Sequence, residues 1–204
     1  IDLNRGCSGF VEALMIVDTY FKSGIIKEAL IIAADSYSKH FGLENKSVSM
    51  VFGDCASFSF VKKSETNILF SDTISKFMDN RHISLMGDKL NMDGPAVLSF
   101  VRAHVLPQII KTLDFANSRE IKLTKAIVHQ GSKIVVDEIR KKNSWDEDFC
   151  PFFVGACGNV NSSTIPVGLK TILDDKGFIE GNFLLSGFGV GLSSSTILIP
   201  LSKP

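Results

Sequence analysis

The chain has 204 residues, of which 45% are hydrophobic and 22% are charged, and its 22 basic residues balance 22 acidic ones. This composition is typical of a globular protein that buries a sizeable core, and it excludes an intrinsically disordered chain. The zero net charge gives no indication of nucleic acid or an anionic membrane as a partner. No apolar run reaches the length of a membrane span.

Apolar side chains at helical spacing over residues 10–22 predict an amphipathic helix that ends at Ser23-Gly24. The chain begins at Ile1 without an initiator Met, inside what reads as a buried strand. Residues 28–34 form a continuous apolar run, which predicts a doubly covered parallel strand. Residues 49–61 predict a strand pair that is interrupted by a Phe-Gly-Asp turn.

Residues 67–91 read as less regular. Asp93, with a proline two residues later, predicts a helix that runs to about Phe115 and is kinked by Pro107. Further elements are expected at residues 125–129 (strand), 132–142 (helix, with Ile134, Val135 and Ile139 inward), 149–154 (strand), 162–173 (helix), 183–185 (strand) and 196–199 (strand). Strands that alternate with helices predict an α/β protein.

The four cysteines match no dense disulfide framework and form no C-x-x-C pair. No histidine cluster accompanies them, so we expect no metal site. This usage favours a reducing cytoplasm. Cys55, Cys150 and Cys157 read as small core residues.

Cys7 lies in a Gly-Cys-Ser-Gly segment between a strand and the helix that starts near Phe10. Unpaired backbone N–H groups and the positive end of the helix dipole favour a thiolate at this position. The thiolate is the nucleophilic form that acyl transfer uses. A buried structural cysteine is the more common alternative, and Cys7 alone does not exclude it.

Three other segments contain candidate functional residues. His129 ends a strand, where α/β proteins collect functional groups, although an isolated histidine is more often a hydrogen-bonded core residue. Asn159 precedes a Ser/Thr cluster that is an ordinary helix-capping signal. Glycines alternate over residues 187–191, which indicates either a flexible turn or backbone N–H groups that approach a reacting carbonyl.

In this order the motifs resemble the condensing enzymes of the thiolase superfamily, most closely β-ketoacyl-acyl carrier protein synthase III. The matching segments are Cys7-Ser8-Gly9-Phe10, Phe52-Gly53-Asp54, Met92-Asp93-Gly94, His129-Gln130, Gly158 to Ser163 and Gly187 to Gly191. The resemblance implies a thiolase-like αβαβα layered fold. Residues 1–66 would be the end of its N-terminal half and residues 67–204 its complete C-terminal half. Most of the first half would then be cleaved off or supplied as a separate chain.

The resemblance also implies an acyltransferase mechanism. Cys7 would accept an acyl group from a thioester, and His129 and Asn159 would stabilise the enolate formed when a malonyl thioester loses carbon dioxide. The backbone N–H groups of Cys7 and Val190 would form the oxyanion hole. The enolate concentrates its charge on one oxygen. A neutral imidazole and an amide can both donate a hydrogen bond to that oxygen.

By the same resemblance, Phe188 and Ser132 would contact substrate. The substrates would be acyl-CoA and a malonyl thioester, with acyl carrier protein as a further candidate partner and with no cofactor. The protein would be a cytoplasmic homodimer of fatty acid or related specialised biosynthesis, without nucleic acid or membrane partners.

Three departures from the family pattern indicate a specialised homologue. After His-Gln the family usually carries Ala-Asn and then a basic residue, but here stand Gly131, Ser132, Lys133 and Ile134. The second asparagine is absent and the positive charge is displaced, which leaves docking of a carrier protein open. Val190 replaces a usual glycine and narrows the pocket, and Ser194 stands where an aromatic residue is common.

Other functions fit the same residues. One is an acyltransferase without decarboxylation or a synthase of the hydroxymethylglutaryl-CoA type, whose acidic base would come from the absent part. Another is a non-catalytic partner subunit, although the intact Cys7, His129 and Asn159 argue against it. A degradative thiolase is disfavoured, because no second cysteine follows Gly158.

Overall fold

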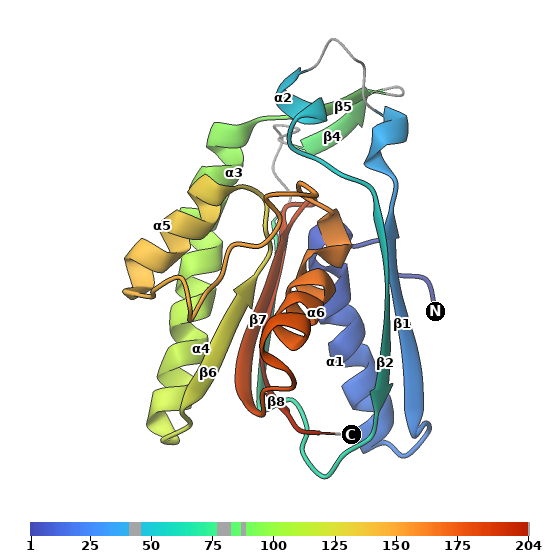
Figure 1. Ribbon diagram of the computed structural model, residues 1–204, viewed down its shortest axis with the longest axis vertical. Coiled ribbons are helices and arrows are strands. Elements are labelled where there is room, and N and C mark those ends of the chain that lie inside the picture. The colour runs from blue at the N-terminus through green and yellow to red at the C-terminus, as the bar shows by residue number, and fades with distance from the viewer. Residues whose placement is uncertain (41–45, 77–82, 87–88, 204) are drawn as a thin grey trace.

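A computed structural model describes residues 1–40, 46–76, 83–86 and 89–203 (Figure 1). Its strands are β1 (Glu28–Asp35), β2 (Cys55–Lys62), β3 (Phe70–Ser75), β4 (Ile83–Met86), β5 (Lys89–Met92), β6 (Leu123–Val128), β7 (Gly181–Gly189) and β8 (Ser193–Leu201). Its α-helices are α1 (Gly9–Lys22), α2 (Lys46–Ser49), α3 (Gly94–Phe100), α4 (Leu106–Ser118), α5 (Lys133–Asn143) and α6 (Thr164–Lys176). Short helical turns are η1 (Gly6–Ser8), η2 (Tyr37–His40), η3 (Val101–Val105) and η4 (Asn161–Ser163).

The elements stack in layers (Figure 1). A four-stranded sheet has the order β3-β8-β7-β6, in which β6 and β7 are parallel and the other pairs are antiparallel. Helices α4 and α5 cover one face of this sheet, and α1 and α6 cover the other. Beyond α1 and α6 lies an antiparallel ribbon of β1 and β2. These layers agree with the predicted α/β class, and they amount to four of the five layers that the resemblance implies.

The core is divided between the two faces of the four-stranded sheet. Leu184 points to the cluster under α4 and α5, whereas its neighbour Leu185 points to the cluster that contains α1 and α6. Successive residues of a strand face opposite sides, so a strand covered on both sides buries every side chain. Each fully buried leucine stabilises the fold by about 1.5–3 kcal/mol relative to an exposed one.

The helix predicted at residues 10–22 is confirmed as α1, but two strand predictions in this part of the chain are wrong. Residues 1–5 form no strand, and Ile1 is 89% exposed. A strand needs a neighbour for its backbone hydrogen bonds, and no described strand pairs with this segment. Of the strand pair expected at residues 49–61, only the second strand forms, as β2. In place of the first, the chain leaves α2 and makes an isolated bridge between Phe52 and Asn159.

The strand expected at residues 28–34 is confirmed as β1, but its expected environment is not. It pairs antiparallel with β2, and its outer side chains are exposed instead of doubly covered. The irregular stretch predicted for residues 67–91 instead contains β3, β4 and β5. Among the described residues no helix covers the outer face of the β1–β2 ribbon (Figure 1).

The helix predicted to begin at Asp93 is confirmed, with the Asp93 carboxylate accepting from the Ala96 N–H at 3.0 Å. The helical path continues to Ser118 and contains the π-helical turn η3, which ends two residues before Pro107. Proline has no N–H to donate, and a widened turn is one way to accommodate that loss.

Two further expectations in the C-terminal part are wrong. Residues 149–154 form no strand. Pro151 lacks an N–H, and the segment meets β6 through a hydrogen bond from the Ala126 N–H to Phe149 C=O. In α5, Val135 and Ile139 are buried as predicted, but Ile134 is 71% exposed. Strands β7 and β8 extend beyond the predicted ranges and shorten the glycine-rich loop to residues 190–192.

Ser194, which stands where an aromatic residue is common, belongs to a buried polar network. Its hydroxyl donates to Gln108 Oε1 at 2.6 Å, and the Thr196 hydroxyl donates to the same oxygen at 3.0 Å. Of the three cysteines predicted in the core, Cys150 is buried, Cys55 is partly buried and Cys157 is exposed. Within the described segments, no helix combines the length and the apolar character needed to cross a membrane.

Candidate active site

Cys7 lies in the tight turn η1, two residues before the first residue of α1. Its side chain is 6% exposed, and the backbone of β7 approaches it closely: a Cβ on Gly189 would lie 2.8 Å from Cys7 Sγ. Glycine at this position therefore leaves room for the sulfur. The Val190 side chain occupies the space beside Gly6, where a Cβ would lie 2.2 Å from Val190 Cγ1.

Burial and, to a smaller extent, the negative charge of Asp35 raise the pKa of the Cys7 thiol to about 12. The backbone N–H groups of Val190 and of Cys7 itself lower this pKa by donating toward the sulfur. Burial thus outweighs the donors, and the resting group is a thiol, contrary to the thiolate predicted from the helix terminus. The same two N–H groups are the ones expected to form the oxyanion hole.

His129 follows the last residue of β6, and its backbone N–H donates to Ser186 C=O at 2.7 Å. Its ring is 3% exposed and meets the Phe188 ring edge-on, with centroids 5.3 Å apart. Burial lowers the pKa of His129 to about 3, opposed by the Asn161 carbonyl. The imidazole is therefore neutral at neutral pH.

Thr164 decides which ring nitrogen of His129 carries the proton. The Thr164 hydroxyl lies 2.8 Å from His129 Nδ1 and 3.0 Å from the Asn161 carbonyl oxygen. It has a single proton to donate. If it donates to Nδ1, the histidine proton resides on Nε2; if it donates to Asn161, Nδ1 carries the proton instead.

Asn159 is fixed by backbone pairing with the segment that precedes β2. Its N–H donates to Val51 C=O at 2.7 Å, and its C=O accepts from the Gly53 N–H at 3.0 Å. Its side-chain Oδ1 accepts from the Asn161 N–H at 2.9 Å. This contact leaves the amide Nδ2 as the end that can donate to a ligand.

One cavity of about 110 Å³ brings the predicted site residues together. Its lining includes Cys7, His129, Asn159, Ser132, Phe188 and Val190. Ser132 also caps α5, because its hydroxyl accepts from the Val135 N–H at 3.4 Å. The chain positions of these residues span most of the sequence, so the fold and not local sequence creates the site.

The cavity also contains residues that sequence reasoning missed. Tyr37 stacks on Phe52 with ring centroids 5.2 Å apart, and burial together with the charges of Cys7 and Asp35 raises its pKa. Asn161 lies in the motif around Asn159, but no role had been assigned to it. Tyr37 lies in no recognised motif; it belongs to η2, which follows β1, and folding brings it to the cavity that Cys7 also lines.

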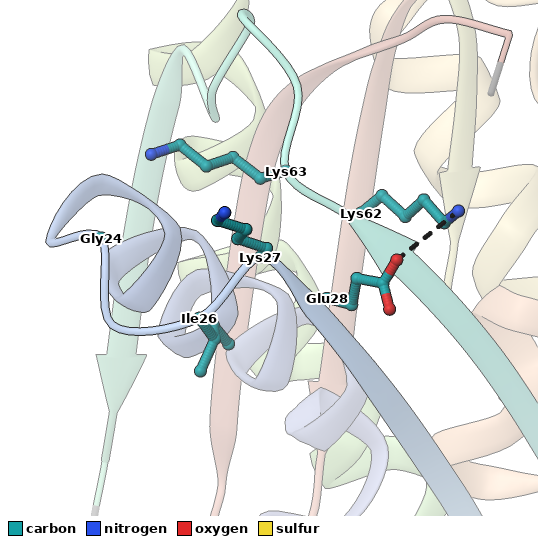
Figure 2. Close-up of a pocket in the computed structure, with 6 residues that line it drawn as sticks. All are labelled: Gly24, Ile26, Lys27, Glu28, Lys62 and Lys63. Carbon is teal, nitrogen blue, oxygen red and sulfur yellow. Dashed lines mark ion pairs between the residues drawn. The ribbon is translucent and has the colours of Figure 1, made fainter.

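A second hollow lies at the opposite end of the ribbon, lined by Gly24, Ile26, Lys27, Glu28, Lys62 and Lys63 (Figure 2). Its lysine side chains point in different directions, and Lys62 pairs with Glu28 at 3.5 Å in a half-exposed ion pair. It has no cysteine or histidine in its lining. Among the described residues no group of three or more His, Cys, Asp or Glu could hold a metal ion.

Two family models match the chain: 3-oxoacyl-[acyl-carrier-protein (ACP)] synthase III over residues 1–77, and the C-terminal part of the same family over residues 113–201. Beta-ketoacyl-[acyl-carrier-protein] synthase III of Streptococcus pneumoniae (strain Hungary19A-6) is 27% identical over 219 residues, which cover 98% of this chain and 67% of that protein. The protein of the same name from Clostridium tetani (strain Massachusetts / E88) is 23% identical over 224 residues, which cover 97% and 67%.

Solved structures show the same relationship. A crystal structure of 3-oxoacyl-(acyl-carrier-protein) synthase III superposes with a TM-score of 0.87 at 27% identity, covering 98% of this chain and 68% of the other. The enzyme of that name from Aquifex aeolicus VF5 superposes with a TM-score of 0.89 at 24% identity, covering 98% and 67%. The chain therefore has the thiolase-like fold and spans about two thirds of the length of these relatives.

Proposed function

The chain belongs to the 3-oxoacyl-[acyl-carrier-protein] synthase III family of condensing enzymes, and on this premise we propose that Cys7, His129 and Asn159 carry out a decarboxylative Claisen condensation. The observation that supports these roles is the single cavity that all three side chains line. It places a nucleophile beside two neutral hydrogen-bond donors, which is the combination that the two half-reactions need.

In the first half-reaction, Cys7 Sγ attacks the carbonyl carbon of an acyl-CoA thioester. The carbon–sulfur bond to CoA breaks, and the thiol proton leaves with the CoA sulfur. His129 is a poor base for this proton, because burial lowers its pKa to about 3. The N–H groups of Cys7 and Val190, which already face the sulfur, would hold the oxyanion. Loss of one such donor typically costs about 2.7–4 kcal/mol of transition-state stabilisation.

In the second half-reaction, a malonyl thioester loses carbon dioxide and becomes an enolate. Its oxygen would accept hydrogen bonds from Asn159 Nδ2 and His129 Nε2. The second bond requires the proton on Nε2, which follows when the Thr164 hydroxyl donates to Nδ1. The enolate carbon then attacks the acyl-Cys7 carbonyl and expels the cysteine sulfur, which regains a proton.

The acyl donor proposed for this chain is a CoA thioester, and the acceptor is a malonyl group on CoA or on a carrier protein. The two relatives described above are both named for acyl carrier protein. Lys133, the displaced basic residue after His-Gln, is paired with Asp137 at 2.6 Å on the surface of α5. The homodimer and the cytoplasmic location stay predictions, and light scattering checks the first.

The test is intact-protein mass spectrometry after incubation with a panel of acyl-CoA thioesters. We expect a mass increase of one acyl group that is absent in Cys7→Ser. Cys157→Ser is the matched control, because it removes an exposed cysteine outside the cavity and should keep the adduct. No adduct on the chain of 204 residues would mean that this part cannot acylate itself, whereas no adduct on a longer or two-chain protein would favour a non-catalytic subunit.

Release of carbon dioxide from malonyl-CoA separates the remaining alternatives. We expect His129→Ala and Asn159→Ala each to lose this release while Cys7 still becomes acylated. Acylation of Cys7 without any release of carbon dioxide by the wild type would favour an acyltransferase that does not decarboxylate.

A further inference from the structure

Asn161 is a buried residue whose backbone serves the rest of the site. It lies in η4 with a positive φ of 52° and with no exposed surface. Its N–H donates to Asn159 Oδ1 at 2.9 Å, and its C=O lies 3.0 Å from the Thr164 hydroxyl oxygen. Asparagine tolerates this left-handed backbone better than most residues, but glycine tolerates it as well and would not bury a side-chain amide. The backbone conformation alone therefore does not explain the asparagine.

The Asn161 side chain contacts the nucleophile. Its Oδ1 lies 3.8 Å from Cys7 Sγ, where it accepts from the thiol. Its Nδ2 is fully buried and has no hydrogen-bond partner among the described residues. A buried donor without a partner is costly, so the position of this amide calls for a compensating role.

We propose that Asn161 is the hydrogen-bond partner that stabilises the Cys7 thiolate, because its amide can rotate to present Nδ2 instead of Oδ1 to the sulfur. The two ends of an amide have nearly the same shape, and half a rotation about Cβ–Cγ exchanges them. A thiol donates to Oδ1, whereas a thiolate accepts from Nδ2. Either orientation leaves one end unpaired, so the protonation state of Cys7 selects between them.

The surroundings of Cys7 explain why such a donor is needed. The titratable groups that face the sulfur are Asp35 at the end of β1, Tyr37 in η2 and His129 after β6. The charge of Asp35 opposes a thiolate, and the neutral His129 supplies no positive charge. An amide N–H adds a donor without adding a buried cation, alongside the backbone N–H of Val190.

This inference rests on the proposed role of Cys7 as nucleophile, but its test does not use acyl transfer. The pH dependence of the alkylation rate of Cys7 by iodoacetamide reports its thiolate fraction, and peptide mapping by mass spectrometry assigns the rate to Cys7. In Asn161→Gly, which keeps the left-handed backbone and loses the amide, we expect the profile to move to higher pH. A shift of one unit slows alkylation at pH 7 about tenfold.

Asn161→Asp is isosteric, and we expect a shift at least as large, because a carboxylate cannot donate and adds negative charge. Ser163→Ala is the matched control, since Ser163 lies in the same turn and bonds Ala33 C=O at 2.8 Å and not Cys7. It should leave the profile unchanged. Exposed Cys157 provides an internal reference rate in each variant.

An unchanged Cys7 profile in folded Asn161→Gly, or an equal shift in Ser163→Ala, would overturn the inference. Failure of the proposed function looks different: the wild type would form no acyl adduct, while the alkylation profile would still respond to Asn161→Gly.

Discussion

The two sheets of this protein use similar apolar strands but bury them to different extents. In β7 every side chain from Phe183 onward is buried, because helices pack on both faces. In the β1–β2 ribbon, Leu30 and Ile32 are each 57% exposed, although α1 and α6 cover the opposite face. They pair with Phe60 and Phe58, which are 60% and 67% exposed. Apolar sequence therefore marks a strand here, but only a packed neighbour turns it into core.

The active site lies between these two regions and depends on both. The four-stranded sheet supplies His129 at the end of β6 and Phe188 in β7. The ribbon side supplies Asp35, which raises the pKa of Cys7 and accepts hydrogen bonds from Ser162 N–H and Oγ. Substitutions on the sheet side should therefore change stability strongly, whereas those on the outer ribbon face should not.

Leu185→Ala should produce the largest loss of stability. The side chain is 1% exposed, so its removal leaves a cavity and costs about 2–5 kcal/mol in the free energy of unfolding. Ile32→Ala on the outer ribbon face should cost less than about 1 kcal/mol. Equilibrium unfolding in urea measures both. Similar losses for the two variants would mean that the outer face of the ribbon is covered in solution.

Acid should destabilise the protein through His129. Its pKa is lowered to about 3 in the folded state by burial, so between pH 6.5 and 3 the unfolded chain binds a proton that the folded chain does not. The free energy of unfolding is therefore highest above about pH 6.5 and falls toward pH 3, on the order of a few kcal/mol. Urea unfolding at a series of pH values measures this slope, and His129→Gln should flatten it.

The ribbon offers the matched control for this charge effect. Glu28 and Lys62 form an ion pair whose side chains are about half exposed, so Glu28→Gln should change stability by less than about 1 kcal/mol. If the free energy of unfolding of His129→Gln still falls toward pH 3 as steeply as that of the wild type, the loss of stability in acid comes from groups other than His129.

The sequence predicted helices better than strands, and the reason is physical. The helical spacing of α1 and the Asp93 cap are local signals, and both were confirmed. Strand β3 was missed, because a strand depends on a partner that can be distant along the chain: β3 pairs with β8, more than 100 residues later. Strands β4 and β5 were missed too, although they pair with each other. Residues 149–154 are apolar enough for a strand, but they do not pair with a neighbouring strand in a sheet.

The candidate site was predictable only where motifs marked it. Cys7, His129 and Asn159 carry local sequence signals, and the structure places all three on one cavity. Asn161 and Thr164 occur in the quoted motif, but their contacts with Cys7 and His129 exist only after folding. The protonation state of Cys7 was misjudged, because the helix terminus is visible in sequence whereas the depth of burial is not.

The smallest change in stability is expected from Phe58→Thr combined with Phe60→Thr. Threonine keeps the preference for a strand while removing two exposed rings, so the free energy of unfolding should stay within about 1 kcal/mol of the wild type. A dye that fluoresces on exposed apolar surface should nevertheless bind much less, because these rings and the facing Leu30 and Ile32 form one patch.

Ile134→Thr on α5 is the control, since it removes a 71% exposed side chain outside the ribbon and should leave dye binding unchanged. Undiminished dye binding in the double variant would place the accessible apolar surface elsewhere, and a large loss of stability would show that the rings are packed in solution. The expected combination, altered surface with unaltered stability, is what separates the ribbon from the sheet.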